Sequence, residues 1–88
     1  MDLEDYRREI DRLNSEIVDA ISRRMNVVEE VGEYKKENNM DVVDEEREEK
    51  VKQQFEKLFI DEDLPREKGR EIAEILIQTA VKREGEIT

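Results

Sequence analysis

The sequence predicts an all-α protein made of three helices, one long and two shorter. Helix breakers are sparse, because the 88 residues include only one proline and three glycines. Apolar residues recur with a heptad-like spacing from Leu3 to Tyr34, which is typical of an amphipathic helix. Helix-start signals follow at Asp44 and Pro65. We therefore expect a single helical domain over residues 1–88.

The first helix is expected over residues 2–38, because Asn38 and Asn39 end the periodic pattern. Its apolar stripe has two seam positions and one flanking position. The seam holds Leu3, Ile10, Ile17, Arg24 and Val31 at one position, and Tyr6, Leu13, Ala20, Val27 and Tyr34 at the other. The flank holds Arg7, Asn14, Ile21, Val28 and Lys35.

The second helix is expected over residues 44–60, with Asp44 as its N-cap and two glutamates in its first turn. The third is expected over residues 65–84, with Pro65 at its first position and Gly85 as its stop. The predicted inner faces are Val51, Phe55, Leu58 and Phe59 on the second helix, and Ile72, Ile75, Leu76, Thr79 and Ala80 on the third.

The first helix is too long for two shorter helices to cover its stripe. A helix of about 37 residues is about 55 Å long, whereas a compact domain of this size has a radius of gyration of only about 12 Å. A second copy packed on the stripe resolves the conflict. Two-fold symmetry makes antiparallel packing of the long helices the expected form, so we predict a homodimer.

The composition excludes several kinds of chemistry. The formal net charge is -10, and the chain has no cysteine and no histidine. Disulfides, thiolate nucleophiles and sulfur metal sites are therefore excluded, and the usual general base and commonest metal ligand are missing. The acidic balance argues against nucleic acid, and no stretch approaches the roughly 18 apolar residues of a membrane span. We expect a cytoplasmic protein without metal or cofactor, and its acidic N-terminus does not look like a secretory signal.

Basic side chains occupy positions that the helical periodicity turns inwards. Arg24 lies on the seam, and Lys35 follows three turns later on the same side, about 16 Å along the axis. Arg7 lies about 25 Å before Arg24, so only an antiparallel partner helix brings it to the same place. A desolvated cation needs a partner, and several converging cations favour a bound anion.

The shorter helices add charges to the same interior. Arg47 precedes Val51 by four residues and so faces inwards, Glu48 borders that face, and Glu84 is partly inward. Arginine donates two parallel hydrogen bonds to a carboxylate, so a small dicarboxylate is the expected ligand. Simpler interpretations compete: the cations snorkel to water, Arg47 and Glu48 belong to a solvated helix start, Asp44 is only an N-cap, and Glu84 faces solvent.

Four motifs stand in order along the predicted helices. They are Tyr6-Arg7-Arg8-Glu9-Ile10-Asp11-Arg12-Leu13-Asn14, Ile21-Ser22-Arg23-Arg24, Val31-Gly32-Glu33-Tyr34-Lys35 and Asp44-Glu45-Glu46-Arg47-Glu48. Together they resemble the small all-helical chorismate mutases, over nearly the full length and without gaps. The resemblance implies an intertwined antiparallel helical homodimer. It also implies conversion of chorismate to prephenate, a step of phenylalanine and tyrosine biosynthesis.

The resemblance assigns a role to each inward cation. Arg7 of one subunit, with Arg24 and Arg47 of the other, would hold the two carboxylates of the chorismate dianion. Lys35 would contact a carboxylate and the ether oxygen. The reaction is an intramolecular rearrangement that needs no nucleophile and no metal, which suits a chain without histidine or cysteine. Catalysis would rest on holding a reactive conformer and on stabilising the negative charge that develops on the ether oxygen.

Four further positions belong to the implied site. Glu48 would accept a hydrogen bond from the ring hydroxyl, with the Asp44 backbone nearby. Ala80 stands where the family often has a small polar residue, and Glu84 stands where it usually has a glutamine that donates to the ether oxygen. A carboxyl group donates only when it is protonated, so we hypothesise that catalysis by Lys35, Arg24 and Glu84 is best at acidic pH.

Two alternative functions remain open. An isochorismate-pyruvate lyase on the same scaffold would use a similar basic pocket and would release free pyruvate. A non-catalytic helical dimer, acting as a regulatory or interaction module, would use its inner cations only structurally. Replacing Arg24 or Lys35 with alanine would leave the function of such a module intact.

Overall fold

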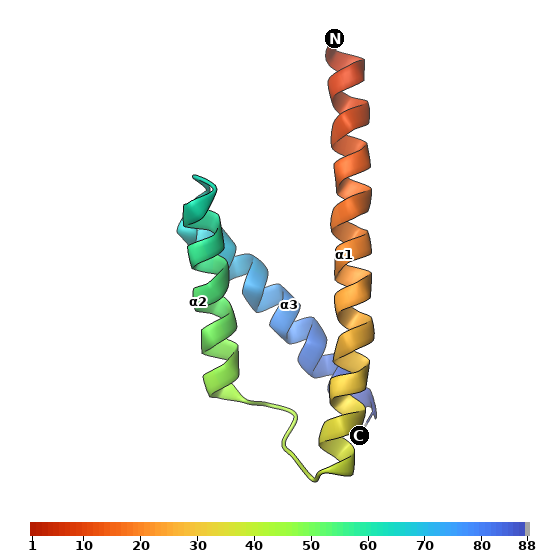
Figure 1. Cartoon of the computed structure of the whole chain (residues 1–88), viewed down its shortest axis with the longest axis vertical. Helices are drawn as coiled ribbons and strands as arrows, with labels where there is room; N and C mark the ends of the chain where they lie inside the picture. The colour runs from red at the N-terminus through yellow and green to blue at the C-terminus, as the bar shows by residue number, and fades with distance from the viewer. Residues whose placement is uncertain (88) are drawn as a thin grey trace.

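The structure, a computed structural model, describes residues 1–87, which form three helices and no strand. The helices are α1 (Leu3–Glu37), α2 (Glu45–Asp61) and α3 (Arg66–Ile87) (Figure 1). The predicted all-α fold with one long and two shorter helices is confirmed. Within this described range, no helix combines the length and the apolar character that crossing a membrane requires.

Aspartates fix the starts of α1 and α2. The Asp2 side chain accepts a hydrogen bond from the Asp5 backbone N–H at 2.9 Å, and the Asp5 side chain accepts one from the Asp2 backbone N–H at 3.0 Å. This reciprocal arrangement satisfies two backbone donors near the helix start. The Asp44 side chain accepts a hydrogen bond from the Arg47 backbone N–H at 3.0 Å. Asp44 is therefore the N-cap of α2, directly outside the helix.

Non-glycine residues reverse the chain after α1 and after α2. Asn39 has a φ of 53° and Asp63 a φ of 58°, both in the left-handed region. Asparagine and aspartate tolerate this conformation because their short polar side chains bond locally. Each follows the C-cap of its helix by one residue, so the two turns are set by local sequence.

α3 continues to Ile87, so the prediction that Gly85 ends this helix near residue 84 was wrong. Glycine costs about 1 kcal/mol in a helix relative to alanine, but it ends a helix mainly where φ is positive. No described glycine has a positive φ. Contacts hold the last turn instead: Arg83 pairs with Glu86 at 3.0 Å, and Lys36 of α1 donates to the Ile87 carbonyl oxygen at 3.4 Å.

The buried face of α3 is rotated away from the predicted one. Ile72 and Ile75 are 42% and 62% exposed, and Thr79 is exposed as well, so their predicted inward placement is wrong within the single chain. The sequence prediction followed the large apolar residues of α3. The stripe along which the helices approach closely instead includes small residues. The buried residues of α3 are Gly69, Ala73, Ile77, Ala80 and Glu84.

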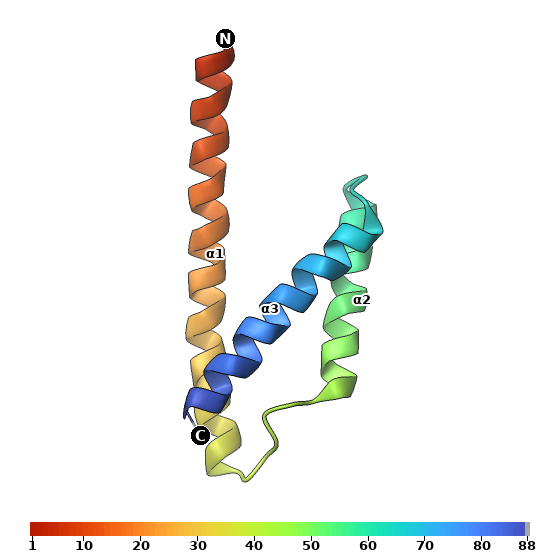
Figure 2. The same cartoon turned by 180° about the vertical axis from the view of Figure 1, so that it is seen from behind.

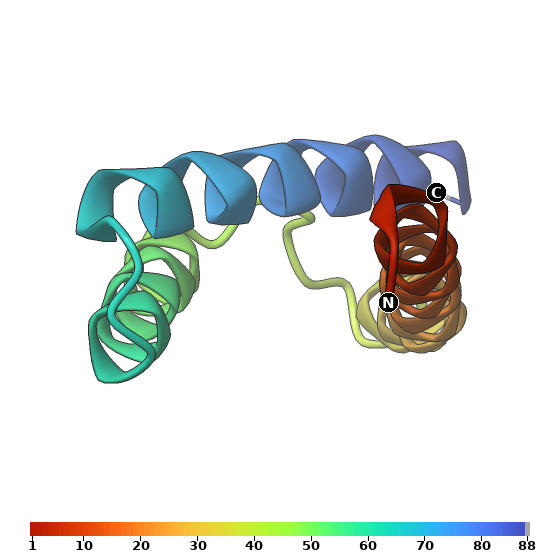
Figure 3. The same ribbon diagram turned by 90° about the horizontal axis from the view of Figure 1, so that it is seen from above.

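α3 joins the other two helices. It packs against both α1 and α2, while the backbones of α1 and α2 do not approach each other within residues 1–87. Seen from above, α1 and α2 lie on the same side of α3 (Figure 3). Seen from behind, the C-terminal part of α3 crosses the C-terminal part of α1, and the N-terminal half of α1 extends beyond it (Figure 2).

A small apolar core joins α2 to α3. Its members are Val51, Ala73 and Ile77, with Phe55 and Val81 packed against them. Gly69 allows the close approach, because a Cβ atom there would lie 2.7 Å from the Phe55 carbonyl oxygen and 2.8 Å from the Phe59 ring. Only glycine fits this crossing without a shift of the two helices.

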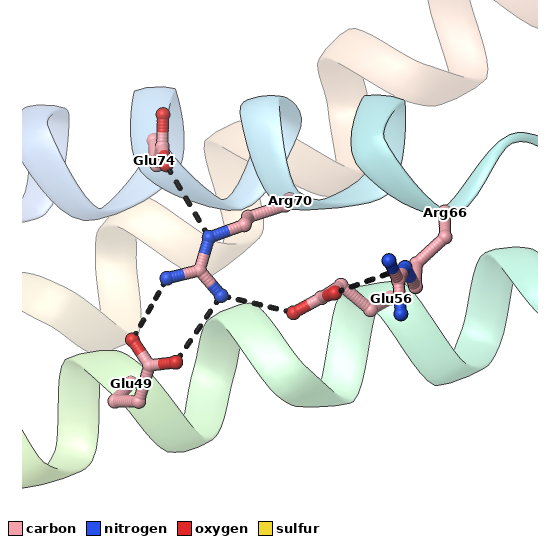
Figure 4. Close-up of polar contacts among 5 residues, drawn as sticks. All are labelled: Glu49, Glu56, Arg66, Arg70 and Glu74. Atoms are coloured by element: carbon pink, nitrogen blue, oxygen red, sulfur yellow. Dashed lines mark hydrogen bonds and ion pairs between the residues drawn. The ribbon is translucent and has the colours of Figure 1, made fainter.

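An ion-pair network borders this core (Figure 4). Arg70 of α3 donates two hydrogen bonds to Glu49, at 3.1 and 3.0 Å, and one to Glu56 at 2.9 Å. Arg70 also lies 3.7 Å from Glu74, and Arg66 lies 3.5 Å from Glu56. The hydrogen bonds from Arg70 lower the pKa of the Glu49 carboxyl below its ordinary value of 4.5. The network joins α2 to α3 along the edge of their apolar contact.

The single chain is more extended than a compact domain. Its radius of gyration is 16.1 Å, whereas about 12 Å is expected for a compact chain of this length. The apolar seam of α1 is largely exposed. The exposed residues on it include Leu3, Tyr6, Ile10, Leu13, Ile17, Val27, Val31 and Tyr34. A continuous exposed apolar surface of this kind is typical of a protein–protein interface.

Candidate active site

A cavity of about 190 Å³ lies where the second half of α1, the link to α2, the start of α2 and the end of α3 meet. This space exceeds that of one water molecule by about an order of magnitude. Its charged lining residues are Arg24, Lys35, Asp44, Arg47, Glu48 and Glu84. Its apolar lining residues are Val28, Val31, Val42, Val51, Ile77, Ala80 and Val81. The cavity therefore brings together every predicted site residue except Arg7.

Lys35 and Glu84 form the most buried ion pair of the described chain. Their side chains are 16% and 8% exposed, and Lys35 Nζ lies 2.8 Å from Glu84 Oε1. Among residues 1–87 this oxygen has no aligned hydrogen bond, so the contact is mainly electrostatic. Lys35 Nζ also donates to the Val42 carbonyl oxygen at 2.8 Å. An ion pair with α3 and a hydrogen bond to the link before α2 thus hold the ammonium group at the cavity.

Arg24 brings an unsatisfied donor to the cavity. Its NH1 atom is buried and has no hydrogen-bond partner among residues 1–87. A buried donor without an acceptor costs about 1–3 kcal/mol, and more when it is charged. An anion that accepts a hydrogen bond from Arg24 would remove this cost.

The first turn of α2 supplies three charged residues. Arg47 lines the cavity but remains exposed, whereas Glu48 is half-buried. Asp44 lines the cavity too, although its carboxylate is already engaged as the N-cap of α2. Glu49, the residue after Glu48, accepts hydrogen bonds from Arg70 of α3. The start of α2 is therefore held both by its own N-cap and by a contact with α3.

Arg7 lies outside the cavity. It is an exposed residue in the second turn of α1, and its NH1 atom donates to Glu4 of the same helix at 2.8 Å. The cavity is lined by residues 24–35 of α1, more than four helical turns away. Within one chain, Arg7 therefore contributes nothing to the site.

Sequence reasoning missed two features of the lining. The Val42 carbonyl oxygen accepts from Lys35, and a backbone acceptor in a link leaves no signal in residue type. Val81 lines the cavity and packs on the α2–α3 core, but it lies beside the stripe that the sequence selected for α3. Ala80 is buried in the wall, where it offers only a methyl group.

The charges of the cavity balance when all are ionised. Three cations, from Arg24, Lys35 and Arg47, face three carboxylates, from Asp44, Glu48 and Glu84. Two of the carboxylates are engaged, since Asp44 caps α2 and Glu84 pairs with Lys35. Apolar walls strengthen electrostatic interactions between the remaining groups and a ligand. The arrangement suits recognition of a small anion.

Comparison with known proteins identifies the family. Residues 6–85 match the chorismate mutase type II family. No curated protein and no solved structure matches the chain at a significant level. Because the match covers nearly the whole chain, the protein belongs to the chorismate mutase type II family.

Proposed function

We propose that this member of the chorismate mutase type II family rearranges chorismate to prephenate. In that reaction the ether C–O bond of chorismate breaks while a new C–C bond forms in the same molecule. No atom is gained or lost, and no nucleophile, metal or cofactor takes part. The enzyme has to hold the dianion in a reactive conformer and stabilise the charge that develops on the ether oxygen.

The observation that carries this proposal is the buried Arg24 NH1 atom without a hydrogen-bond partner among the described residues. It lines the same cavity as Lys35, Arg47 and Glu84. A carboxylate of the substrate accepts from Arg24, and Arg47 binds the second carboxylate from the exposed side of the cavity. Both contacts are made in the ground state and orient the reacting groups.

The remaining lining residues act on the ring and the ether oxygen. Lys35 donates to the ether oxygen and to a neighbouring carboxylate, and its charge stabilises the transition state more than the substrate. Glu48 accepts from the ring hydroxyl, close to the Asp44 backbone. Ala80 offers no polar group, so one auxiliary contact that a small polar side chain would make is absent.

We further propose that the active form is an intertwined antiparallel homodimer. The exposed apolar seam of α1 supports this, since a partner helix covers it and so removes it from water. The antiparallel arrangement carries Arg7 of one subunit to the cavity of the other. There it exchanges its contact with the exposed Glu4 for a substrate carboxylate.

The carboxyl group of Glu84 faces the ether oxygen in this proposal. The ionised cavity has three cations and three carboxylates, hence no net charge, and Arg7 of the partner adds one positive charge. A carboxyl group donates a hydrogen bond only when it carries a proton, whereas a carboxylate repels both the substrate and the developing charge on the ether oxygen. The role of Glu84 is therefore the part of the proposal that the following test addresses.

The test is a chorismate assay from acidic to neutral pH, with identification of the product. We expect prephenate formation that weakens as the pH rises. In Glu84→Gln the amide donates at every pH, so the profile should flatten. Glu86→Gln, on the exposed side of the same helix, is the matched control and should keep the wild-type profile. An unchanged acid-favouring profile in Glu84→Gln would reject the role of this residue.

Assays with isochorismate and with a chorismate-like dicarboxylate test the alternatives. Free pyruvate released from isochorismate, without turnover of chorismate, indicates the lyase. A folded dimer that turns over neither substrate, and that gains no thermal stability from a chorismate-like dicarboxylate, indicates a non-catalytic module.

A further inference from the structure

The crossing of α1 and α3 brings two catalytic candidates together at a glycine. Gly32 is the only buried residue of α1 within the described chain. A Cβ atom added to it would lie 3.0 Å from Ile87 Cδ1, 3.3 Å from Glu84 Cα and 3.4 Å from Glu84 Cγ. The first neighbour is the end of a flexible side chain, but the second is backbone. Alanine at position 32 therefore pushes on the α3 backbone at Glu84 itself.

Polar contacts join α1 and α3 on both sides of Gly32. One turn before it, Glu29 Oε1 accepts from Arg83 Nε at 2.9 Å and from Arg83 NH2 at 2.7 Å. One turn after it, Lys36 donates to the Ile87 carbonyl oxygen at 3.4 Å. Positions 29, 32 and 36 lie on one helical face, because their spacings are three and four residues. The close approach at Gly32 and these polar contacts therefore belong to the same contact surface.

The crossing sets the relation between Lys35 and Glu84. Lys35 follows Gly32 by three residues on α1, and Glu84 follows Arg83 directly on α3. The 2.8 Å separation of their charged atoms thus depends on how deeply α3 seats against Gly32. A shift of a few tenths of an ångström at the crossing changes the separation of the two backbones that carry these groups, while Lys35 Nζ is also held by the Val42 carbonyl oxygen.

We propose that Gly32 and the Glu29–Arg83 pair are positioning residues that set the placement of Glu84 against Lys35 at the reacting ether oxygen. Neither Gly32 nor Arg83 lines the cavity, so they act through the other two residues. The proposal rests on the proposed function for its effect on catalysis, but its structural part concerns the Lys35–Glu84 contact alone.

The activity test compares two matched pairs of variants. Gly32→Ala is set against Gly85→Ala, since a Cβ at position 85 would lie within 4 Å of no atom among residues 1–87, apart from its chain neighbours and the adjacent backbone of its own helix. Glu29→Gln is set against Glu86→Gln, because each removes one carboxylate partner of Arg83, but only Glu29 links α3 to α1. We expect kcat to fall about tenfold or more in Gly32→Ala and by a smaller factor in Glu29→Gln, since small misplacements of catalytic groups are costly. Both controls should keep the wild-type kcat.

The split between kcat and KM separates positioning from a general loss of structure. In the proposed function Arg24 and Arg47 bind the substrate in the ground state, so a loss confined to the Lys35–Glu84 contact should change KM much less than kcat in Gly32→Ala. Truncating Ile87 to alanine in the Gly32→Ala background removes the side-chain contact but leaves the one to Glu84 Cα. Full recovery of kcat in that double variant would show that Ile87 packing caused the loss, and would overturn the proposal. Equal effects in Gly32→Ala and Gly85→Ala would also overturn it.

A second readout does not depend on turnover. The coupling of Lys35 and Glu84 is measured by a double-mutant cycle with Lys35→Met and Glu84→Gln, as the non-additive factor in the unfolding equilibrium constant. We expect this factor to shrink in the Gly32→Ala background and to persist in the Gly85→Ala background. An unchanged factor with an active wild-type enzyme contradicts the positioning proposal only. A changed factor with an inactive wild-type protein contradicts the proposed function only.

Discussion

The two halves of α1 follow the same sequence pattern but have different surroundings. In residues 3–20, apolar seam residues recur every three to four positions, yet every residue except Asp5 is exposed. In residues 24–37, the same pattern continues, and Arg24, Val28 and Lys35 are half-buried around a cavity. Only this second half packs against α3, while the first half extends away from the rest of the chain (Figure 1).

The comparison shows that forming a helix and burying its apolar face against another element are separate requirements. Capping, spacing and the scarcity of breakers favour a helix in both halves. Coverage requires a second element, which α3 provides for one half only. The basic residues follow the same division: Arg24 reaches a cavity, whereas Arg7 pairs with its own helix. In the proposed homodimer, a second copy covers the apolar face of the first half of α1, as α3 covers that of the second half.

The largest expected effect comes from placing a charge on the uncovered seam. Ile17 and Val18 are 58% and 64% exposed in the single chain, so their surroundings there are alike. Ile17→Asp should abolish the dimer, because an unpaired charge buried in an interface costs several kcal/mol. Val18→Asp, off the seam, should leave it intact. Sedimentation of both variants measures the difference, and equal behaviour would contradict the antiparallel seam.

The next effect tests whether the first half of α1 contributes Arg7 to the active site of a partner subunit. Arg7→Ala should lower kcat/KM about 10²- to 10³-fold, as the loss of one charged contact to the substrate typically does. Arg8→Ala removes the neighbouring arginine, which pairs with Asp5, and should change little. A mixed dimer of Arg7→Ala and Arg24→Ala subunits should regain part of the activity, since one of its two sites has both arginines. Full activity of Arg7→Ala alone would confine the site to one subunit.

A smaller effect concerns the packed part of the chain. Gly69→Ala forces a Cβ against the Phe55 carbonyl oxygen and should destabilise the fold by about 1–3 kcal/mol. Gly85→Ala should instead stabilise it by up to about 1 kcal/mol, because alanine favours a helix. Thermal unfolding at several protein concentrations measures both. The Gly69→Ala loss should persist at every concentration, whereas that of Ile17→Asp should depend on concentration.

The smallest effect is a pH dependence at the α2–α3 contact. The hydrogen bonds from Arg70 lower the pKa of Glu49, so the pair stabilises the fold above the ordinary glutamate pKa of 4.5 and loses this contribution as the pH falls through the lowered value. Glu49→Gln should narrow the difference in melting temperature between neutral and strongly acidic pH. Glu33→Gln, at an exposed position of α1, is the control. An identical acid response in both variants would show that the pair contributes nothing to stability.

Much of the site was predictable because it lies on helices with a clear period. Arg24 and Lys35 stand at seam and flank positions of a strongly periodic helix, and Asp44 carries a capping signal. Their meeting in one cavity follows once these helices pack. The basic residues stood out because charges on a buried stripe need a partner, whatever the partner is.

Other features were beyond such reasoning. The inner face of α3 was predicted correctly at Ala80 but wrongly at Ile72 and Ile75 within the single chain. These two residues outweigh Gly69 and Ala73 in hydrophobicity, although close helix packing selects the small residues. The end of α3 at Ile87 depends on contacts with α1, which no local signal encodes.

The sequence by itself determined three helices, the N-cap of the second and most of the charged residues that line the cavity, because these depend on spacing and on neighbours within a few residues. The tertiary structure alone decided how closely Glu84 faces Lys35, the use of the Val42 carbonyl as a partner, and the burial of the Arg24 NH1 atom without a hydrogen-bond partner among residues 1–87. The first of these involves the crossing at Gly32, where α3 lies against α1 at Glu84, and that contact arises only when residues some fifty positions apart in the chain come together.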